Sequence, residues 1–252
     1  MRFLKHQDLE NPHGSSIVWR YMSLEKFLDL LTHKRLFFTN AANFTDGYEV
    51  SLPLNIVKSH RKKLKAQGLS GRDLEEELAV FEYNHQPMRD LTLVNCWSMG
   101  RHESYALWKI YLGGAKAGVA IRTTFSRVKK SILAENDAYP EDIYAGVVQY
   151  KDFLPEQELS RFRLVTTKRE FYSYEHELRM FILHYPRSEG GVKPPYNLSS
   201  GRHVALDLDT LVEQVYLSPF VAQWFGDTLT EIMAKVSPNL VSRLTVSSIR
   251  DQ

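Results

Sequence analysis

The side chains best suited to chemistry fall in one short segment, Tyr172 to Leu183, in which spaced carboxylates run into an apolar stretch. Successive residues of a strand point to opposite faces, so this pattern predicts an apolar face and a charged face. The two faces would hold Leu178, Met180 and Ile182 on one side, and Glu175, Glu177 and Arg179 on the other. The simplest interpretation, favoured for this segment taken alone, is a sheet whose charged face is solvated.

The functional alternative places the same carboxylates in a cleft. A glutamate fixed at the start of a rigid strand can bind a sugar hydroxyl and stabilise the positive charge that develops on an anomeric carbon. Glu177 would take that role, and Glu175 would orient or deprotonate the attacking nucleophile. Cleavage of any glycosidic bond, the nicotinamide bond of NAD included, passes through such a charged state.

Two other segments carry polar side chains at strand positions. Arg20, in the apolar run 17–22, could hold a phosphate bidentately, although a structural ion pair explains it about equally well. Asn95 and Ser98 flank Trp97 at the end of an apolar strand, where the indole could stack on a flat ring or belong to the core.

The elements that must position these residues are strands and helices in mixed order. Strands are expected at 17–22, 35–39, 91–97, 118–123, 144–150, 172–185, 204–208, 212–217 and 242–249. Helices are expected at 24–31, 53–84 with a break at 67–71, 104–112, 156–167 and 220–236, and a long loop at 186–202. No regular strand–helix–strand alternation appears, which favours an α+β fold with a mixed, mainly antiparallel sheet core and flanking helices. We expect one domain over residues 1–252, with a helical insertion or lid at about 53–90.

Composition narrows the class of protein further. Hydrophobic content of 43% and charged content of 25% are ordinary for a globular chain, and a net charge of +2 is too mild to indicate a nucleic-acid partner. The single cysteine, Cys96, excludes an internal disulfide. The polar N-terminus and the lack of a long apolar run predict a cytoplasmic protein with no membrane partner.

Several common site motifs are missing from the sequence. It contains neither a phosphate-binding P-loop nor a G-x-G-x-x-G turn between strand and helix. The pairs His102-Glu103 and His176-Glu177 are not completed to a zinc-binding H-E-x-x-H, and G-x-S-x-G is absent. We therefore expect no metal and no serine nucleophile.

Five short boxes, in a fixed order, make the chain resemble a widespread bacterial family of uncharacterised domains. They are Trp19-Arg20-Tyr21, the run 43–49, Cys96-Trp97-Ser98, the run 107–111 with 118–121, and the run 174–179. The second box departs from the family pattern, because Thr45 and Gly47 stand where the family usually has Asn and Pro. The layout of that family is in turn similar to ADP-ribosyltransferases, which have an arginine or histidine on the first strand and a late E-x-E.

The resemblance implies an ADP-ribosyltransferase-like fold with NAD as substrate and assigns roles to residues of this chain. Arg20 would bind the NAD phosphates, and Ser98 would support the nicotinamide ribose. Tyr21, Trp97 or Tyr111 would stack on nicotinamide, with Glu177 as the catalytic glutamate and Glu175 as its target-positioning partner.

The function expected from the resemblance is ADP-ribosyl transfer to a macromolecule, nucleic acid or protein, by a bacterial toxin or anti-phage effector with a neutralising antitoxin as partner. Two alternatives stay open: an NAD glycohydrolase, and a non-catalytic module that binds a nucleotide or a partner protein. For a nucleic-acid acceptor, phosphate contacts could come from the basic run 60–65 or from Arg161, Arg163, Lys168 and Arg169, although each group alone is better explained as a solvated helix face.

Overall fold

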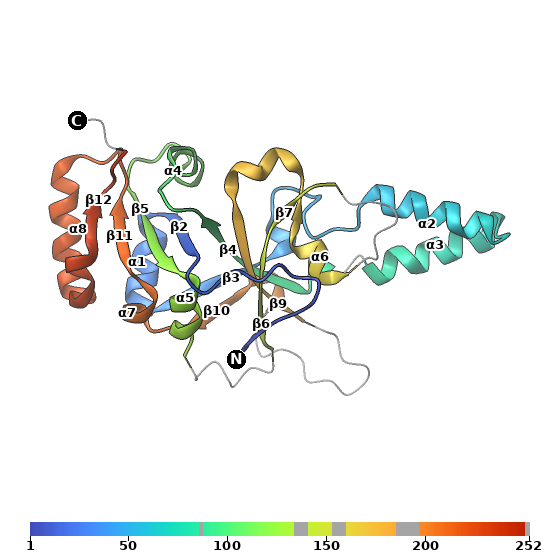
Figure 1. The fold of residues 1–252 in the computed structure, drawn as a ribbon, viewed down its shortest axis with the longest axis horizontal. Helices are drawn as coiled ribbons and strands as arrows, with labels where there is room; N and C mark the ends of the chain where they lie inside the picture. The colour runs from blue at the N-terminus through green and yellow to red at the C-terminus, as the bar shows by residue number, and fades with distance from the viewer. Residues whose placement is uncertain (86–87, 134–140, 153–159, 185–196, 250–252) are drawn as a thin grey trace.

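The computed structural model describes residues 1–85, 88–133, 141–152, 160–184 and 197–249 (Figure 1). Its main feature is one large mixed sheet whose strands run in the order β1-β6-β9-β4-β2-β5-β11-β12, with β3 pairing to β4 and β10. Most of these pairs are antiparallel, and β1–β6 and β11–β12 are parallel. The expected mixed, mainly antiparallel sheet with flanking helices is therefore present.

The strands of this sheet are β1 (Phe3–Leu4), β2 (Ile17–Ser23), β3 (Arg35–Asn40), β4 (Thr92–Met99), β5 (Gly118–Thr124), β6 (Ile143–Val147), β9 (Glu177–Leu183), β10 (Arg202–Ala205), β11 (Gln214–Leu217) and β12 (Leu244–Val246). A separate two-stranded parallel sheet joins β7 (Gln149–Tyr150) to β8 (Thr167–Lys168).

The α-helices are α1 (Leu24–His33), α2 (Leu54–Ala66), α3 (Gly71–His85), α4 (Tyr105–Leu112), α5 (Phe125–Ser131), α6 (Arg161–Val165), α7 (Leu208–Leu211) and α8 (Gln223–Val236). Short 3-10 turns are η1 (Ala41–Asn43), η4 (Glu170–Glu175), η5 (Leu198–Ser200) and η6 (Pro238–Arg243). None of the described helices is long and apolar enough to cross a membrane.

Local sequence explains why α4 begins and ends where it does. The Ser104 side chain accepts a hydrogen bond from the backbone N–H of Leu107, which satisfies a donor that the first turn of a helix leaves free. Gly113 then ends the helix in the left-handed conformation, φ 55°, which costs glycine little. The helix is thereby held with Leu107 and Trp108 against the sheet.

The two faces of the sheet are buried by different elements. On one face, apolar residues of β2, β4, β5 and β9 pack with α1 and α8 in the main core, through side chains such as Phe27, Leu31 and Met233. On the other face, α4 covers β2 and β5 near Trp19 and Tyr21. A second cluster there, with Val94, Phe181 and Phe162 among its members, covers β4 and β9. Because both faces are covered, β9 is buried along its whole length.

The sheet splits along the edge of β4 that faces β2. Here β2 pairs with only the end of β4, at Ser98 and Met99, whereas β3 pairs with its beginning, at Leu93 and Val94. Residues 95–97 pair with β9 on the opposite edge, and no described strand pairs with them on this one. Polar backbone groups of residues 95–97 on this edge therefore need hydrogen-bond partners other than a strand. Side chains or a ligand can supply them, so the split is a candidate position for a binding site.

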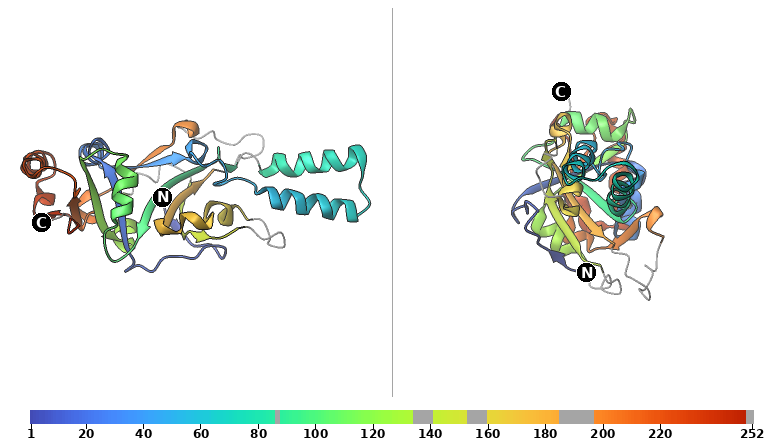
Figure 2. Two further views of the ribbon diagram at one scale, coloured as in Figure 1. Left: turned by 90° about the horizontal axis from the view of Figure 1, so that it is seen from above. Right: turned by 90° about the vertical axis from the view of Figure 1, so that its right-hand side faces the viewer.

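Helices α2 and α3 form an antiparallel hairpin that projects from the end of the molecule along its long axis (Figures 1 and 2). It has a small core of its own, formed by Leu64, Leu74 and Leu78 with Leu69 packed against them. The helical insertion expected near residues 53–90 is thus an arm that extends away from the sheet. Helices α2 and α3 together are called the arm.

Two expectations about the segment 172–185 are wrong. The strand begins only at Glu177, because residues 170–175 form a 3-10 turn and His176 takes a left-handed conformation, φ 43°. Glu175 and Glu177 are therefore not alternate residues of one strand. The charged side chains are also not solvated, since Glu177 and Arg179 are only 3% and 1% exposed. The apolar face formed by Leu178, Met180 and Ile182 is as predicted.

The bounds of other elements differ from those expected because pairing between strands outweighs the local sequence pattern. The 144–150 strand is divided into β6 and β7, and Thr167–Lys168 forms β8 instead of ending a helix. Of the helix expected at 156–167, the part before residue 160 lies outside the described residues, as do residue 185 of the expected strand and residues 186–196 of the expected loop.

Candidate functional site

A cavity of about 750 Å³ opens in the split between β2 and β4. Its walls come from β2, α1, β3, β4, α4 and β10. The lining residues that bear on function are Arg20, Tyr21, Glu25, Asp29, Cys96, Trp97, Ser98, Tyr111 and His203. All five residues predicted to bind a cofactor line this cavity, whereas neither Glu175 nor Glu177 is among its lining residues.

Arg20 bridges the split. Its Nη1 donates hydrogen bonds to Asn95 Oδ1, at 2.9 Å, and to the backbone carbonyl oxygen of Cys96, at 2.8 Å. The guanidinium thus takes the place of a missing neighbouring strand on β4. Within the described part of the chain it has no carboxylate at ion-pair distance, and burial lowers the pKa of Arg20 from its usual value. A cation in these surroundings favours an anionic ligand.

Of the three predicted stacking rings, only one has a large accessible surface. Trp97 is 2% exposed, and its indole N–H donates to Asn95 Oδ1 at 2.7 Å. Tyr21 is also buried, with its hydroxyl accepting from the backbone N–H of Ser104. Tyr111 is 45% exposed and stacks on Tyr21 with ring centroids 6.2 Å apart. Tyr111 is therefore the ring best placed to cover a ligand.

Ser98 and Cys96 connect the cavity to a buried ion network behind β4. The Ser98 hydroxyl donates to the backbone carbonyl oxygen of Glu175 at 2.7 Å, and the Cys96 thiol interacts with the Glu177 carboxylate. Burial, followed by the charge of Glu177, raises the pKa of the Cys96 thiol well above its usual range. Cys96 consequently stays a neutral thiol between the cavity and Glu177.

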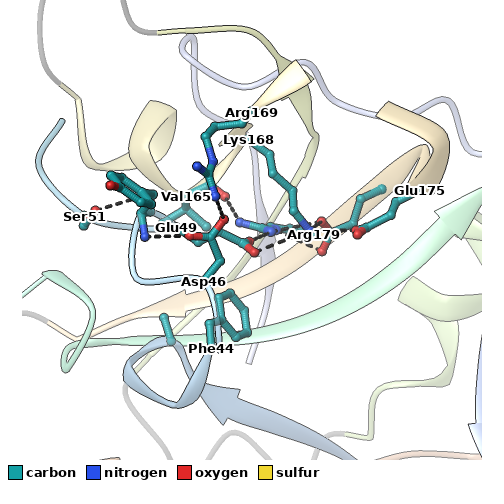
Figure 3. A network of polar contacts seen from close by, with 12 residues as sticks. Phe44, Asp46, Glu49, Ser51, Val165, Lys168, Arg169, Glu175 and Arg179 are labelled. Atoms are coloured by element: carbon teal, nitrogen blue, oxygen red, sulfur yellow. Dashed lines mark hydrogen bonds and ion pairs between the residues drawn. The ribbon is translucent and has the colours of Figure 1, made fainter. Parts of the chain in front are cut away.

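Arg179 is the centre of this network (Figure 3). It forms a bidentate pair with Glu177 through Nε and Nη2, both at 2.9 Å, and it also binds Glu49 and the backbone carbonyl oxygen of Val165. Phe44 lies against the guanidinium, whose carbon is 5.4 Å from the ring centroid. Burial on its own favours the neutral form of Glu177, but the adjacent Arg179 outweighs it and lowers the pKa of Glu177.

Lys168 closes the network on the other side (Figure 3). Its Nζ lies 2.7 Å from Glu175 Oε2, 3.4 Å from Glu49 Oε1 and 3.6 Å from Glu177 Oε2. Burial, together with the other two carboxylates, raises the pKa of Glu175 even though Lys168 opposes that shift. The two predicted catalytic glutamates therefore have opposite pKa shifts, an arrangement that separates a proton-holding carboxyl group from an ionised one.

Helix α1, β3 and β10 add further polar and aromatic groups to the cavity wall. Glu25 and Asp29 of α1 contribute carboxylates, and Arg35 binds Asp29 at 3.3 Å. Phe37, with a half-exposed ring, lies 4.9 Å from the His203 imidazole. Glu25 belongs to the first turn of α1 and lines the cavity because α1 packs beside the split.

Tyr111 links the cavity to the network electrostatically. Although the residue as a whole is half-exposed, the surroundings of its hydroxyl are buried, which raises the pKa of Tyr111, and the charges of Glu177 and Glu175 add to that effect. The predicted residues thus form two adjoining groups: Arg20, Tyr21, Trp97, Ser98 and Tyr111 around the cavity, and Glu175 and Glu177 in the layer behind it.

Sequence reasoning missed Glu49 and gave Lys168 a different role. Glu49 ends the second box, 43–49, and its carboxylate reaches Arg179 across 130 positions of the chain. Lys168, considered above as a phosphate contact or, more simply, as part of a solvated helix face, is buried and binds carboxylates. Other members of that basic group are also paired internally, Arg163 with Asp8 and Arg169 with Asp46.

Comparisons with protein-family models, curated proteins and solved structures each return no match for this chain. Among the described residues, no group of three or more His, Cys, Asp or Glu side chains is arranged to hold a metal ion.

Proposed function

We propose that the cavity binds a nucleotide of the NAD type and that the protein transfers ADP-ribose from it to a macromolecular acceptor. The observation that carries this proposal is Arg20, a guanidinium without a described carboxylate partner in a cavity of about 750 Å³. A cavity of this size falls in the range that accommodates nucleotide-sized ligands. An arginine fork is the side chain best matched to phosphate oxygens.

The surroundings of Arg20 support a ligand with a flat ring next to its phosphate. Tyr111 offers a half-exposed ring whose far side is supported by Tyr21. Ser98 also lines the cavity, where its hydroxyl could accept a hydrogen bond from a ribose. Such contacts fix the orientation of a glycosidic bond relative to β4 and β9.

The chemical step would rely on the two glutamates behind β4. Glu177, kept ionised by Arg179, supplies negative charge close to the cavity, where positive charge develops on the ribose as the nicotinamide bond breaks. Glu175, whose pKa is raised, is suited to take a proton from the acceptor nucleophile. Water as the acceptor would make the same site an NAD glycohydrolase.

A non-catalytic nucleotide-binding module is the second candidate, and one observation favours it. Glu177 is held bidentately by Arg179, and Cys96 lies between its carboxylate and the cavity. If these contacts persist when a nucleotide is bound, the cavity recognises the ligand without cleaving it.

The test combines binding and turnover. Calorimetry with NAD, ADP-ribose and nicotinamide should give binding by the first two. Arg20→Lys should weaken that binding by about tenfold or more, because a lysine cannot reproduce the fork. Arg122→Lys is the matched control, since Arg122 lies opposite Trp19 on β5, binds Glu213 and is not part of the cavity lining. Equal weakening by both variants, or no binding by the wild type, rules out the site.

Turnover then distinguishes the candidates. Labelled NAD is incubated with RNA, DNA and protein acceptors supplied separately. Label retained on a polymer identifies a transferase, free ADP-ribose identifies a hydrolase, and binding without turnover identifies the module. Glu177→Gln should abolish turnover while NAD binding persists. If that folded variant consumes NAD at the wild-type rate, Glu177 is not the catalytic glutamate.

A further inference from the structure

A second cavity, of about 340 Å³, opens at the base of the arm. Its walls come from the loop 46–49, the start of α2, residues 151–152, β8 and Arg169. Two of its lining side chains, Glu49 and Lys168, are only 9% and 8% exposed and belong to the ion network around Arg179. The network is therefore reached from this second cavity as well as from the first, the one that Arg20 lines.

Glu175 stands between the two cavities. Ser98, which lines the first cavity, donates a hydrogen bond to the backbone carbonyl oxygen of Glu175 at 2.7 Å. Lys168, which lines the second, lies 2.7 Å from the Glu175 carboxylate. A molecule bound in the second cavity is thus one side chain away from Glu175.

Exposed aromatic rings and a guanidinium lie at the rim of the second cavity. The Arg169 guanidinium carbon is 4.5 Å from the ring centroid of Tyr48 and 4.5 Å from that of Phe171, and Asp46 holds Arg169 in place at 2.8 Å (Figure 3). The two rings are 62% and 60% exposed. Tyr174, one 3-10 turn after Phe171 on the same side of η4, is 45% exposed. Rings that are open to solvent beside cations are the platforms on which the bases of single-stranded nucleic acids stack.

A stripe of lysines leads from the second cavity along α2. Lys58, Lys62 and Lys65 are exposed and form no ion pair within the described part of the chain. Leu54, which lines the second cavity, and the three lysines follow one another at i, i+4, i+8 and i+11, so all four lie on one side of the helix. At 1.5 Å per residue the stripe is roughly 17 Å long.

The carboxylates of α3 do not cancel this stripe. Arg61, at the edge of the stripe, pairs with Glu75 at 2.7 Å, which fixes the face of the hairpin on which the stripe lies. Helical spacing then puts Asp73 and Glu77 on the opposite face. Glu82 shares the side of Glu75, but the three unpaired lysines outnumber it. A phosphate backbone that follows α2 therefore meets a positively charged surface.

We propose that the second cavity, the exposed rings and the lysine stripe together bind a single-stranded nucleic acid. Its phosphates lie along Lys58, Lys62 and Lys65, and its bases stack on Tyr48 and Phe171 or enter the cavity. The role of the strand as acceptor of ADP-ribose rests on the function proposed above, whereas its binding does not.

The transfer step assigns each atom a place. The bond between the ribose and the nicotinamide nitrogen breaks, and its electron pair leaves with nicotinamide. The same ribose carbon forms a bond to a hydroxyl or amino group of the strand, and the proton of that group passes to the ionised form of Glu175.

Two other partners match the surface less well. A duplex keeps its bases stacked on one another, so Tyr48 and Phe171 would contribute nothing to its binding. An acidic protein segment could pair with the lysines but has no row of flat rings to cover the aromatic side chains.

Binding is measured by fluorescence anisotropy with the full chain and a labelled single strand of roughly 12 nucleotides, as RNA and as DNA, from low to high salt. One variant removes the rings, with Tyr48→Ala and Phe171→Ala. Its control is Tyr83→Ala with Trp224→Ala, which removes rings that are 74% and 66% exposed on α3 and α8.

A second variant removes the stripe, with Lys58→Ala, Lys62→Ala and Lys65→Ala. Its control loses the same charge from exposed lysines outside the surface, with Lys116→Ala, Lys130→Ala and Lys235→Ala.

The two variants should fail in different ways. Loss of the rings should weaken binding at least about tenfold and leave its salt dependence unchanged, because stacking releases no counterions. Loss of the lysines should reduce the slope of log affinity against log salt by about 2, since each phosphate contact to a single strand contributes about 0.7. Both controls should bind as the wild type does.

Four results overturn the proposal. They are a wild type that binds no single strand at low salt and about 100 μM protein, controls that bind as weakly as their matched variants, a duplex that binds as tightly as the single strand, and displacement of the strand by polyglutamate of equal charge, which identifies an acidic protein as the partner.

Incubation with labelled NAD separates this inference from the function proposed for the first cavity. Strand binding without NAD turnover contradicts the proposed function and leaves the binding surface in place. NAD turnover without strand binding contradicts the surface and leaves the proposed function in place. If both hold, label should be retained on the strand, and the ring and lysine variants should lose that label while still binding NAD.

Discussion

At the residue scale, the network around Arg179 shows how the fold tolerates buried charge. An arginine that is 1% exposed would be costly in isolation, but Glu177, Glu49 and a backbone carbonyl accept its N–H groups. Lys168 supplies a second cation where the three carboxylates meet. Removing one member therefore leaves a buried charge without its partner.

Glu177→Gln should lower the free energy of unfolding by about 3 kcal/mol at pH 7, near the lower end for a broken buried pair because Glu49 still binds Arg179. Since the folded-state pKa of Glu177 is lowered from 4.5, its stabilisation is present above pH 4.5 and is lost as the pH falls below that value. In urea unfolding, the difference in free energy of unfolding between the wild type and Glu177→Gln should therefore become smaller as the pH drops below 4.5.

Glu175→Gln is the matched control for this effect. The folded-state pKa of Glu175 is raised from 4.5, so its contribution is present below that pH and is lost as the pH rises through the folded value. The free energy of unfolding of Glu175→Gln should accordingly rise relative to that of the wild type as the pH rises above 4.5. If both variants show the same pH dependence, the two carboxyl groups do not occupy the distinct environments described here.

Sequence patterns found the residues of the cavity better than those of the network. Arg20, Asn95 and Ser98 could be selected because polar side chains are unusual within apolar strands. Glu49 could not be selected on physical grounds, since nothing near it in the sequence indicates a partner 130 positions away. The burial of Arg179 was missed for the same reason: strand alternation defines two faces but does not say what covers each.

At the element scale, local signals were reliable where they satisfy backbone groups directly. The helix expected at 104–112 is present as α4, between Ser104 and Gly113, and the break expected at 67–71 separates α2 from α3. Elements that depend on distant pairing were not recognised: β1 is held by β6, and β8 by β7. The mistaken start of β9 has the same origin, because a left-handed His176 has no clear sequence signature.

Gly118→Ala should destabilise the contact between α4 and β5. A Cβ at Gly118 would overlap the Leu112 side chain and lie 2.7 Å from the backbone oxygen of Met22. A backbone atom cannot move aside as a flexible side chain can. The overpacking should therefore lower the free energy of unfolding by about 1–3 kcal/mol. Urea unfolding measures the loss. Gly100→Ala is the control, because its nearest neighbour would be 3.6 Å away, and a similar loss in both variants would contradict a packing origin.

At the scale of the whole molecule, the apolar interior is divided unevenly. The main core extends from β9 through β4, β2 and β5 to α8, and the cavity lies within this body. The arm has a separate cluster of leucines that shares no member with the other three. Local unfolding of the arm should therefore be possible while the sheet stays intact.

Leu74→Ala tests that division of the molecule. Replacing a buried leucine by alanine lowers the free energy of unfolding by about 2–5 kcal/mol. A core of so few leucines can supply little more stability than that to the arm. Hydrogen exchange should show loss of protection throughout α2 and α3, with protection in β4 and β9 unchanged. Lys63→Ala, an exposed change in the same hairpin, should leave the protection of the arm within error of the wild type. Loss of protection in β9 on Leu74→Ala would mean that arm and sheet unfold as one unit.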